Sequence, residues 1–193
     1  MTTLRKRSLN LPNILTYARI AAVPVVVACM FWPEEDGLRW TAWTIYSVAG
    51  ITDFFDGYLA RIWKQQSSMG RMLDPIADKL LIGAVLLMLV HTGDIRSWSV
   101  WAAIVILCRE MLVSGLREFL AEVRVSVPVT WLAKWKTTVQ LLALGFFITG
   151  PAGVPVYPWT IETGYVLLWI SALLTLYTGW DYFRSGIGHV MDE

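Results

Sequence analysis

Six long apolar stretches run through this sequence and decide its fold class. A transmembrane helix requires about 20 mostly apolar residues. The stretches that reach or approach this length are 13–32, 41–62, 76–92, 98–116, 136–150 and 158–180. Hydrophobic residues make up 56% of the chain and charged residues only 16%, against roughly 25% charged residues in an ordinary soluble domain. The sequence therefore predicts an all-α integral membrane protein, one domain over residues 1–193 that forms a bundle of six transmembrane helices.

The third and fifth stretches, 76–92 and 136–150, are short for complete spans. We expect their helices to extend into the flanking polar segments, because a bilayer core of about 30 Å requires about 20 helical residues. A count of five spans is the alternative.

The basic residues are distributed unevenly over the connections between these stretches. They gather before the first stretch, between the second and third, and around the connection after the fourth: Arg5, Lys6, Arg7, Arg61, Lys64, Arg71, Arg117, Arg124, Lys134 and Lys136. The connections on the opposite side contain only Arg39 and Arg96. Because basic connections stay in the cytoplasm, both termini are expected there. The net charge of +1 gives no indication of nucleic-acid binding.

Four aspartates lie in and between the second and third apolar stretches. A carboxylate at membrane depth costs about 2.5 to 3.5 kcal/mol, so such a residue indicates a function. Asp53 and Asp56 are three residues apart, and Asp74 and Asp78 are four apart, so each pair lies on one helix face. The small residues Gly57, Ala60 and Gly70 leave room beside them for a nucleotide or a pyrophosphate.

The short connection between these two stretches predicts antiparallel neighbouring helices, so the four carboxylates are expected to converge near the cytoplasmic ends. Pro75 either follows Asp74 as the first helical residue or kinks a helix that begins near Ser67. Converging carboxylates are stable only if they are protonated or share bound cations. Hard oxygen ligands suit Mg²⁺, Mn²⁺ or Ca²⁺, and Mg²⁺ commonly binds together with substrate phosphates. The pattern predicts a metal and phosphate site, with structural ion pairs as the alternative.

The spacing of these residues also matches a known signature. From Asp53 to Asp78 the sequence reads D-x-x-D-G-x-x-A-R, then eight residues, then G-x-x-x-D-x-x-x-D. It resembles the signature of the CDP-alcohol phosphatidyltransferases, membrane enzymes that transfer a phosphatidyl or related group from a CDP-linked donor to an alcohol. The resemblance implies a six-helix bundle that forms homodimers in the bacterial inner membrane, with its active site at the cytoplasmic surface.

The resemblance implies roles for the residues at matching positions. Two divalent cations, Mg²⁺ or Mn²⁺, would be held by Asp53, Asp56, Asp74 and Asp78. Asp78 would also be the general base. The residues that would line the site for the CDP moiety are Asp56, Gly57, Ala60, Arg61 and Gly70. In the expected reaction an acceptor hydroxyl attacks the β-phosphorus of CDP-diacylglycerol directly, and CMP leaves.

The acceptor alcohol has to be inferred from the rest of the chain. The stretches "LNLPNILTYARIAAVPVVV", "CREMLVSGLREFLAE" and "WLAKWKTTVQLLAL" resemble bacterial members of the family whose acceptor is glycerol 3-phosphate. This substrate carries about two negative charges near pH 7 and requires cations. The candidate residues for its phosphate are Arg19, Arg109, Arg117, Lys134 and Lys136, with Asn13 and Thr16 as neutral hydrogen-bond donors.

Several alternatives stay open for these residues and for the function. Arg109 could form a structural ion pair with Glu110 or with an aspartate, and Arg117 could pair with Glu118 or Glu122. Lys134 and Lys136 could serve only as anchors at the membrane interface. Other enzymes of the same family, such as cardiolipin, phosphatidylserine and phosphatidylinositol-phosphate synthases, use different acceptors. An ion or proton transporter is the alternative from another class, but it predicts acidic residues spread across the membrane depth, and here they gather toward one side.

Overall fold

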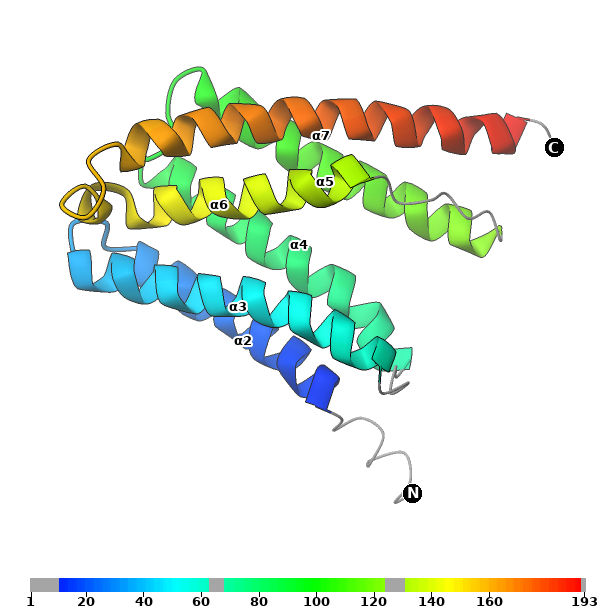
Figure 1. Cartoon of the computed structure of the whole chain (residues 1–193), viewed down its shortest axis with the longest axis horizontal. Helices are drawn as coiled ribbons and strands as arrows, with labels where there is room; N and C mark the ends of the chain where they lie inside the picture. The colour runs from blue at the N-terminus through cyan, green and yellow to red at the C-terminus, as the bar shows by residue number, and fades with distance from the viewer. Residues whose placement is uncertain (1–10, 63–67, 124–130, 192–193) are drawn as a thin grey trace. The chain divides into compact units, whose positions relative to one another are not determined.

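Each of the six apolar stretches lies on one α-helix, apart from at most two residues at an end, in the computed structural model of the chain (Figure 1). The structure describes residues 11–62, 68–123 and 131–191. The helices are α2 (Leu11–Met30), α3 (Asp36–Ile62), α4 (Ser68–His91), α5 (Ser99–Glu122), α6 (Trp131–Gly153) and α7 (Thr160–Met191). No strand occurs in these described ranges, so the prediction of an all-α fold is confirmed for them.

The helices that contain the two short apolar stretches, 76–92 and 136–150, are longer than those stretches. α4 has 24 residues and α6 has 23, and both extend into polar sequence at their N-terminal ends, as expected. At about 1.5 Å per residue, each helix reaches roughly the thickness of a bilayer core.

Three helical segments are long and apolar enough to cross a membrane, within the residues that the structure describes. These segments are Asn13–Met30, Ser99–Leu120 and Thr160–Arg184. In α3 and α4 the aspartates of the signature interrupt the apolar sequence and lower its mean hydropathy. The helices therefore indicate a membrane protein, and the count of six spans stays a prediction.

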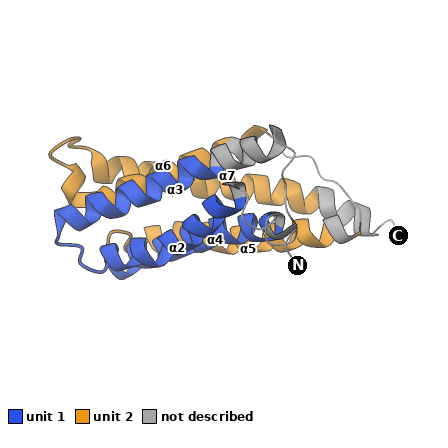
Figure 2. Cartoon of the chain, turned by 90° about the horizontal axis from the view of Figure 1, so that it is seen from below, with its two compact units in different colours: residues 1–92 blue, residues 93–193 orange. Residues whose placement is uncertain are grey.

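The chain forms two compact units, Met1–Thr92 and Gly93–Glu193 (Figure 2). In the first unit, α2 packs against both α3 and α4. In the second unit, α7 packs against both α5 and α6. Each unit thus contains one helix that contacts the other two, and this helix can place side chains between its neighbours.

Pro75 lies inside α4, which begins at Ser68. Of the two possibilities that the sequence left open, the helix that begins near Ser67 is therefore correct. Lys79 Nζ donates a 2.7 Å hydrogen bond to the carbonyl oxygen of Pro75. Because the helix continues through the proline, Asp74 and Asp78 lie one turn apart on the same face.

The C-terminal end of α6 is tightly packed around Gly153. Gly150 has a φ of +47° immediately before Pro151, and the helix is kinked there. A Cβ atom at Gly153 would lie 2.9 Å from Thr149 Oγ1 and 2.9 Å from Thr160 Cγ2. Both distances are below ordinary van der Waals separation, which is about 3.5 to 4.0 Å. A residue with a side chain fits at this position only if its neighbours move.

We therefore expect Gly153→Ala to lower the thermal unfolding temperature of the purified protein. Overpacking a full interior costs about 1 to 3 kcal/mol, which corresponds to several degrees for a chain of this size. Gly37→Ala is the matched control, because a Cβ atom at Gly37 would meet nothing within 4 Å. Equal unfolding temperatures for the two variants would contradict this account of the packing.

Candidate active site

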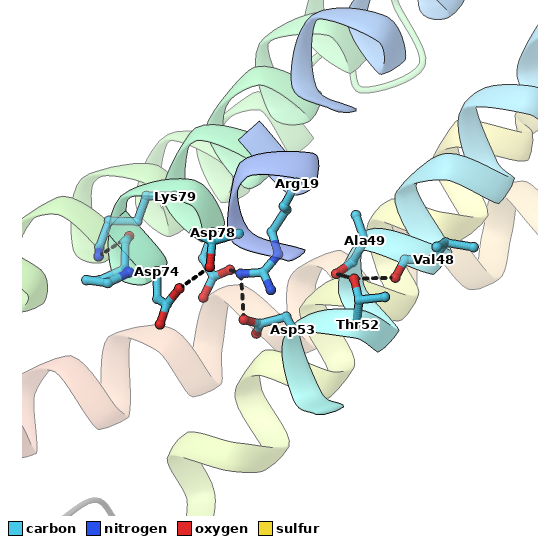
Figure 3. A network of polar contacts seen from close by, with 10 residues as sticks. Arg19, Val48, Ala49, Thr52, Asp53, Asp74, Asp78 and Lys79 are labelled. Atoms are coloured by element: carbon cyan, nitrogen blue, oxygen red, sulfur yellow. Dashed lines mark hydrogen bonds and ion pairs between the residues drawn. The ribbon is translucent and has the colours of Figure 1, made fainter. Parts of the chain in front are cut away.

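The aspartates of the first unit are linked through a buried arginine on α2. Arg19 Nη1 lies 2.6 Å from Asp53 Oδ1 and 2.7 Å from Asp78 Oδ1. The side chain of Arg19 is 1% exposed, whereas those of Asp53 and Asp78 are 40% and 44% exposed. One guanidinium thus holds the carboxylates of α3 and α4 together (Figure 3), and both carboxylates remain accessible to a substrate.

Asp74, one turn before Asp78, is also held by α2. Thr16 Oγ1 donates a 2.5 Å hydrogen bond to Asp74 Oδ1. Thr16 and Arg19 are three residues apart, so they project from the same face of α2. Asn13, one turn earlier on that face, is buried. The N-terminal half of α2 therefore positions three of the four signature aspartates.

This arrangement differs from the sequence-based expectation in how the acidic residues meet. The sequence predicts that α3 and α4 bring their carboxylates together as neighbouring helices. In the structure α2 packs against both helices and places Arg19 between Asp53 and Asp78. The sequence assigns Arg19 and Thr16 to the acceptor phosphate, whereas their side chains contact aspartates here. A buried guanidinium requires an anionic partner, and these carboxylates are the partners that it contacts.

The three described carboxylates fit a divalent cation by their chemistry. Hard cations such as Mg²⁺ and Mn²⁺ bind oxygen ligands, and Asp53 and Asp78 already share one cationic nitrogen. Within residues 11–62, 68–123 and 131–191, no group of three or more His, Cys, Asp or Glu side chains is arranged to hold a metal ion. The side chain of Asp56, the fourth predicted ligand, lies outside the described part of the chain.

The residues expected to line the CDP site lie on α3 and α4. Gly70 is buried one turn before Asp74 on α4. The others belong to the C-terminal part of α3, and nothing beyond their helical backbone is described: Asp56, Gly57, Ala60 and Arg61.

A second cluster of charged residues lies in the second unit. Lys136 Nζ on α6 donates a hydrogen bond to Glu110 Oε1 on α5, and Arg109 Nη1 lies 3.6 Å from the same oxygen. Arg109 Nη2 also donates a 3.1 Å hydrogen bond to Thr178 Oγ1 on α7. Two of the cations expected to bind the acceptor phosphate are therefore brought together around one carboxylate. The pairing of Arg109 with Glu110, an alternative left open by the sequence, is present.

The other two basic residues predicted for the acceptor phosphate also belong to the second unit. The guanidinium of Arg117 lies over the ring of Tyr182 on α7, 5.6 Å from its centroid, a distance at which a cation and an aromatic face attract each other. The side chain of Lys134 lies outside the described residues.

Sequence reasoning misses Thr178 and Gly179, which contact Arg109 from α7. Their only signal in the sequence is a Thr-Gly pair inside the polar and aromatic end of a long apolar helix, "YTGWDYF". Sequence reasoning also misses Glu110 as the partner of Lys136, because the two residues are 26 positions apart on different helices.

The chain belongs to the CDP-alcohol phosphatidyltransferase family, whose family model matches residues 9–177. This range contains the four signature aspartates and also the charged cluster around Glu110.

Several bacterial relatives are similar over nearly the whole chain. A protein of Rickettsia bellii is 48% identical over 91% of this chain and 94% of its own length. A protein of Cereibacter sphaeroides is 37% identical over 95% of this chain and 98% of its own length. A protein of Haemophilus influenzae is 36% identical over 95% of this chain and 97% of its own length. Each of these relatives is named CDP-diacylglycerol–glycerol-3-phosphate 3-phosphatidyltransferase.

Proposed function

We propose that this chain transfers the phosphatidyl group of CDP-diacylglycerol to sn-glycerol 3-phosphate, which gives phosphatidylglycerol phosphate and CMP. The observation that supports this most strongly is the extent of the similarity. Relatives with the corresponding name are 36% to 48% identical over more than nine tenths of the chain. The family match also covers the aspartates of the first unit and the charged cluster of the second.

In the proposed reaction, a hydroxyl oxygen of glycerol 3-phosphate forms a bond to the β-phosphorus of CDP-diacylglycerol. The bond between that phosphorus and the bridging oxygen breaks, and CMP leaves with the bonding electrons. The hydroxyl proton passes to the carboxylate of Asp78, which acts as the general base. A positioned carboxylate can accept this proton as the new bond forms, and the Asp78 side chain is 44% exposed beside its contact with Arg19.

Members of this family generally use divalent metal ions. We assign two of them, Mg²⁺ or Mn²⁺, to Asp53, Asp56, Asp74 and Asp78. When bound, such ions supply positive charge for the donor pyrophosphate and for the departing CMP. Arg19 and Thr16 orient the carboxylates of α3 and α4 before substrate binds, as residues behind metal ligands commonly do. We assign the CDP moiety to Asp56, Gly57, Ala60, Arg61 and Gly70.

The phosphate of the acceptor is assigned to the basic residues. Around Glu110, two cations meet one carboxylate within the described residues, an excess of one positive charge that favours an anionic substrate. Lys136 and Arg109 are largely buried, with 5% and 13% of their side chains exposed, so water screens their attraction for a phosphate only weakly. The full proposed set is Arg19, Arg109, Arg117, Lys134 and Lys136, with Asn13 and Thr16.

We further propose that residues 1–193 form one catalytic domain with six transmembrane helices, assembled as a homodimer in the bacterial inner membrane. The distribution of basic residues supports a cytoplasmic position for both termini and for the aspartates. A C-terminal reporter that is active only in the cytoplasm would test this orientation, and an inactive reporter would reject it. Chemical crosslinking in native membranes would test the homodimer. If the protein still had the size of a monomer after crosslinking, the homodimer would be rejected.

The acceptor is tested with purified protein, CDP-diacylglycerol, Mg²⁺ or Mn²⁺, and a panel of alcohols. We expect CMP release only with glycerol 3-phosphate, and not with serine, inositol phosphate or phosphatidylglycerol. CMP release that depends on another alcohol would identify that alcohol as the acceptor, and the proposed phosphatidyl transfer would still hold. Ion flux into proteoliposomes without any CMP release would instead support the transporter alternative.

Lys136→Met is expected to raise the KM for glycerol 3-phosphate by at least about tenfold, the scale of one hydrogen bond to a charged group. The KM for CDP-diacylglycerol should stay unchanged, since Lys136 is assigned to the acceptor alone. Arg96→Met is the matched control, because Arg96 is an exposed cation in the connection between α4 and α5. Steady-state kinetics with each substrate varied in turn measures both constants. An unchanged acceptor KM in the Lys136 variant would contradict the assignment.

A further inference from the structure

We infer that α7 positions Arg109 for the acceptor phosphate through two residues, Thr178 and Gly179. This inference rests on the proposed function, because that proposal assigns Arg109 to glycerol 3-phosphate. Thr178 and Gly179 lie just beyond residues 9–177, the range that the family model matches. Their role is therefore argued only from their contacts.

The aliphatic part of Arg109 lies directly against the backbone of α7 at Gly179. A Cβ atom at this position would lie 3.0 Å from Cγ of Arg109, 3.4 Å from its Nε and 3.8 Å from its Cδ. The first distance is below the usual separation of two carbon atoms, which is about 3.5 to 4.0 Å. Cγ is close to the backbone of α5, so a shift at Cγ displaces the whole guanidinium. The missing side chain at Gly179 thus sets how closely Arg109 approaches α7.

Thr178 fixes the direction of the guanidinium. Its Oγ1 accepts the 3.1 Å hydrogen bond from Arg109 Nη2 and donates a 2.7 Å hydrogen bond to the carbonyl oxygen of Leu174. Because the hydroxyl proton is directed to Leu174, a lone pair of the oxygen remains for the guanidinium. Thr178 is 5% exposed, so this hydrogen bond is shielded from water.

The Nε atom of Arg109 is buried, and among the described residues it has no hydrogen-bond partner. A buried donor without a partner costs free energy, and a phosphate oxygen is an acceptor that would satisfy it. Alanine at position 179 would add a carbon 3.4 Å from this atom. Gly179 therefore admits the stem of Arg109, and its missing side chain keeps a further carbon atom away from Nε.

The test is steady-state kinetics of purified variants, with glycerol 3-phosphate and CDP-diacylglycerol varied separately. We expect Gly179→Ala and Thr178→Val each to raise the KM for glycerol 3-phosphate roughly tenfold, with the KM for CDP-diacylglycerol unchanged. Thr178→Ser retains the hydroxyl group and should restore the wild-type constant. Gly164→Ala is the matched control on the same helix, because its Cβ atom would contact the Phe147 ring at 3.4 Å, away from Arg109.

The same substitutions are then made in an Arg109→Ala protein. If α7 acts through Arg109, they should raise the acceptor KM no further, because the effects of coupled residues are not additive. Equal increases in both backgrounds would overturn the inference and leave the proposed function intact. An unchanged acceptor KM in Arg109→Ala alone would overturn the assignment of Arg109 and this inference with it. If Gly179→Ala fails to fold, as judged by size-exclusion chromatography, the comparison of Thr178→Val in the two backgrounds decides the test.

Discussion

Asp78→Asn is expected to reduce phosphatidyl transfer by about 10²- to 10⁴-fold, the usual contribution of a general base. Asparagine has nearly the shape of aspartate, and its carbonyl oxygen can still accept the hydrogen bond that Arg19 Nη1 donates to Asp78 Oδ1. It cannot accept the proton of the acceptor hydroxyl as a carboxylate does, and it is a weaker ligand for a cation. The rate of CMP release at saturating concentrations of both substrates measures the loss.

The control for this variant is Asp36→Asn, which replaces an exposed aspartate in the first turn of α3. Asp36 belongs to the same unit but lies at the opposite end of its helix from Asp53, so its replacement should leave the rate unchanged. Thermal unfolding of both variants separates a loss of chemistry from a loss of fold. A rate for Asp78→Asn within a few-fold of the wild type would show that Asp78 is not the base.

The helices and the acidic faces were predictable because both depend on local sequence. Apolar length fixes where a helix can cross a bilayer, and spacings of three and four residues place side chains on one face. Asp74 and Asp78 therefore share a face even though Pro75 lies between them. The sequence left the course of the chain at Pro75 open, because a proline fits either the first turn of a helix or a kink within one.

The partners of the buried cations were not predictable in the same way. The cost of an arginine at membrane depth indicates that Arg19 requires an anionic partner, but a substrate phosphate and an aspartate satisfy that requirement equally well. Only the packing of α2 against both α3 and α4 places Asp53 and Asp78 at Arg19. The role of Gly179 is harder still to predict, because a glycine inside an apolar helix can serve many purposes. Its contact with Arg109 is visible only in three dimensions.

Arg19→Ala is expected to lower the thermal unfolding temperature of the metal-free protein and to increase its stabilisation by Mg²⁺. Without Arg19, Asp53 and Asp78 lose the cation that they share and repel each other. Loss of one partner from a buried ion pair costs about 3 to 5 kcal/mol. Because these carboxylates are 40% and 44% exposed, water screens part of the repulsion, and we expect a loss between that value and the roughly 1 kcal/mol of an exposed pair. A bound divalent cation replaces the missing charge, so it should stabilise the Arg19→Ala variant more than the wild type. This stabilisation grows with the concentration of the cation.

The measurement is the unfolding temperature during a titration with Mg²⁺, starting from protein treated with a chelator and without substrates. Arg19→Lys retains the positive charge and should respond to Mg²⁺ nearly as the wild type does. Arg39→Ala is the matched control, because Arg39 is also buried but its Nε donates a 2.7 Å hydrogen bond to the carbonyl oxygen of Pro33. Its loss should destabilise the protein without changing the response to Mg²⁺. If Mg²⁺ raised the unfolding temperatures of the Arg19→Ala and Arg39→Ala variants equally, the carboxylates beside Arg19 would not be the metal ligands.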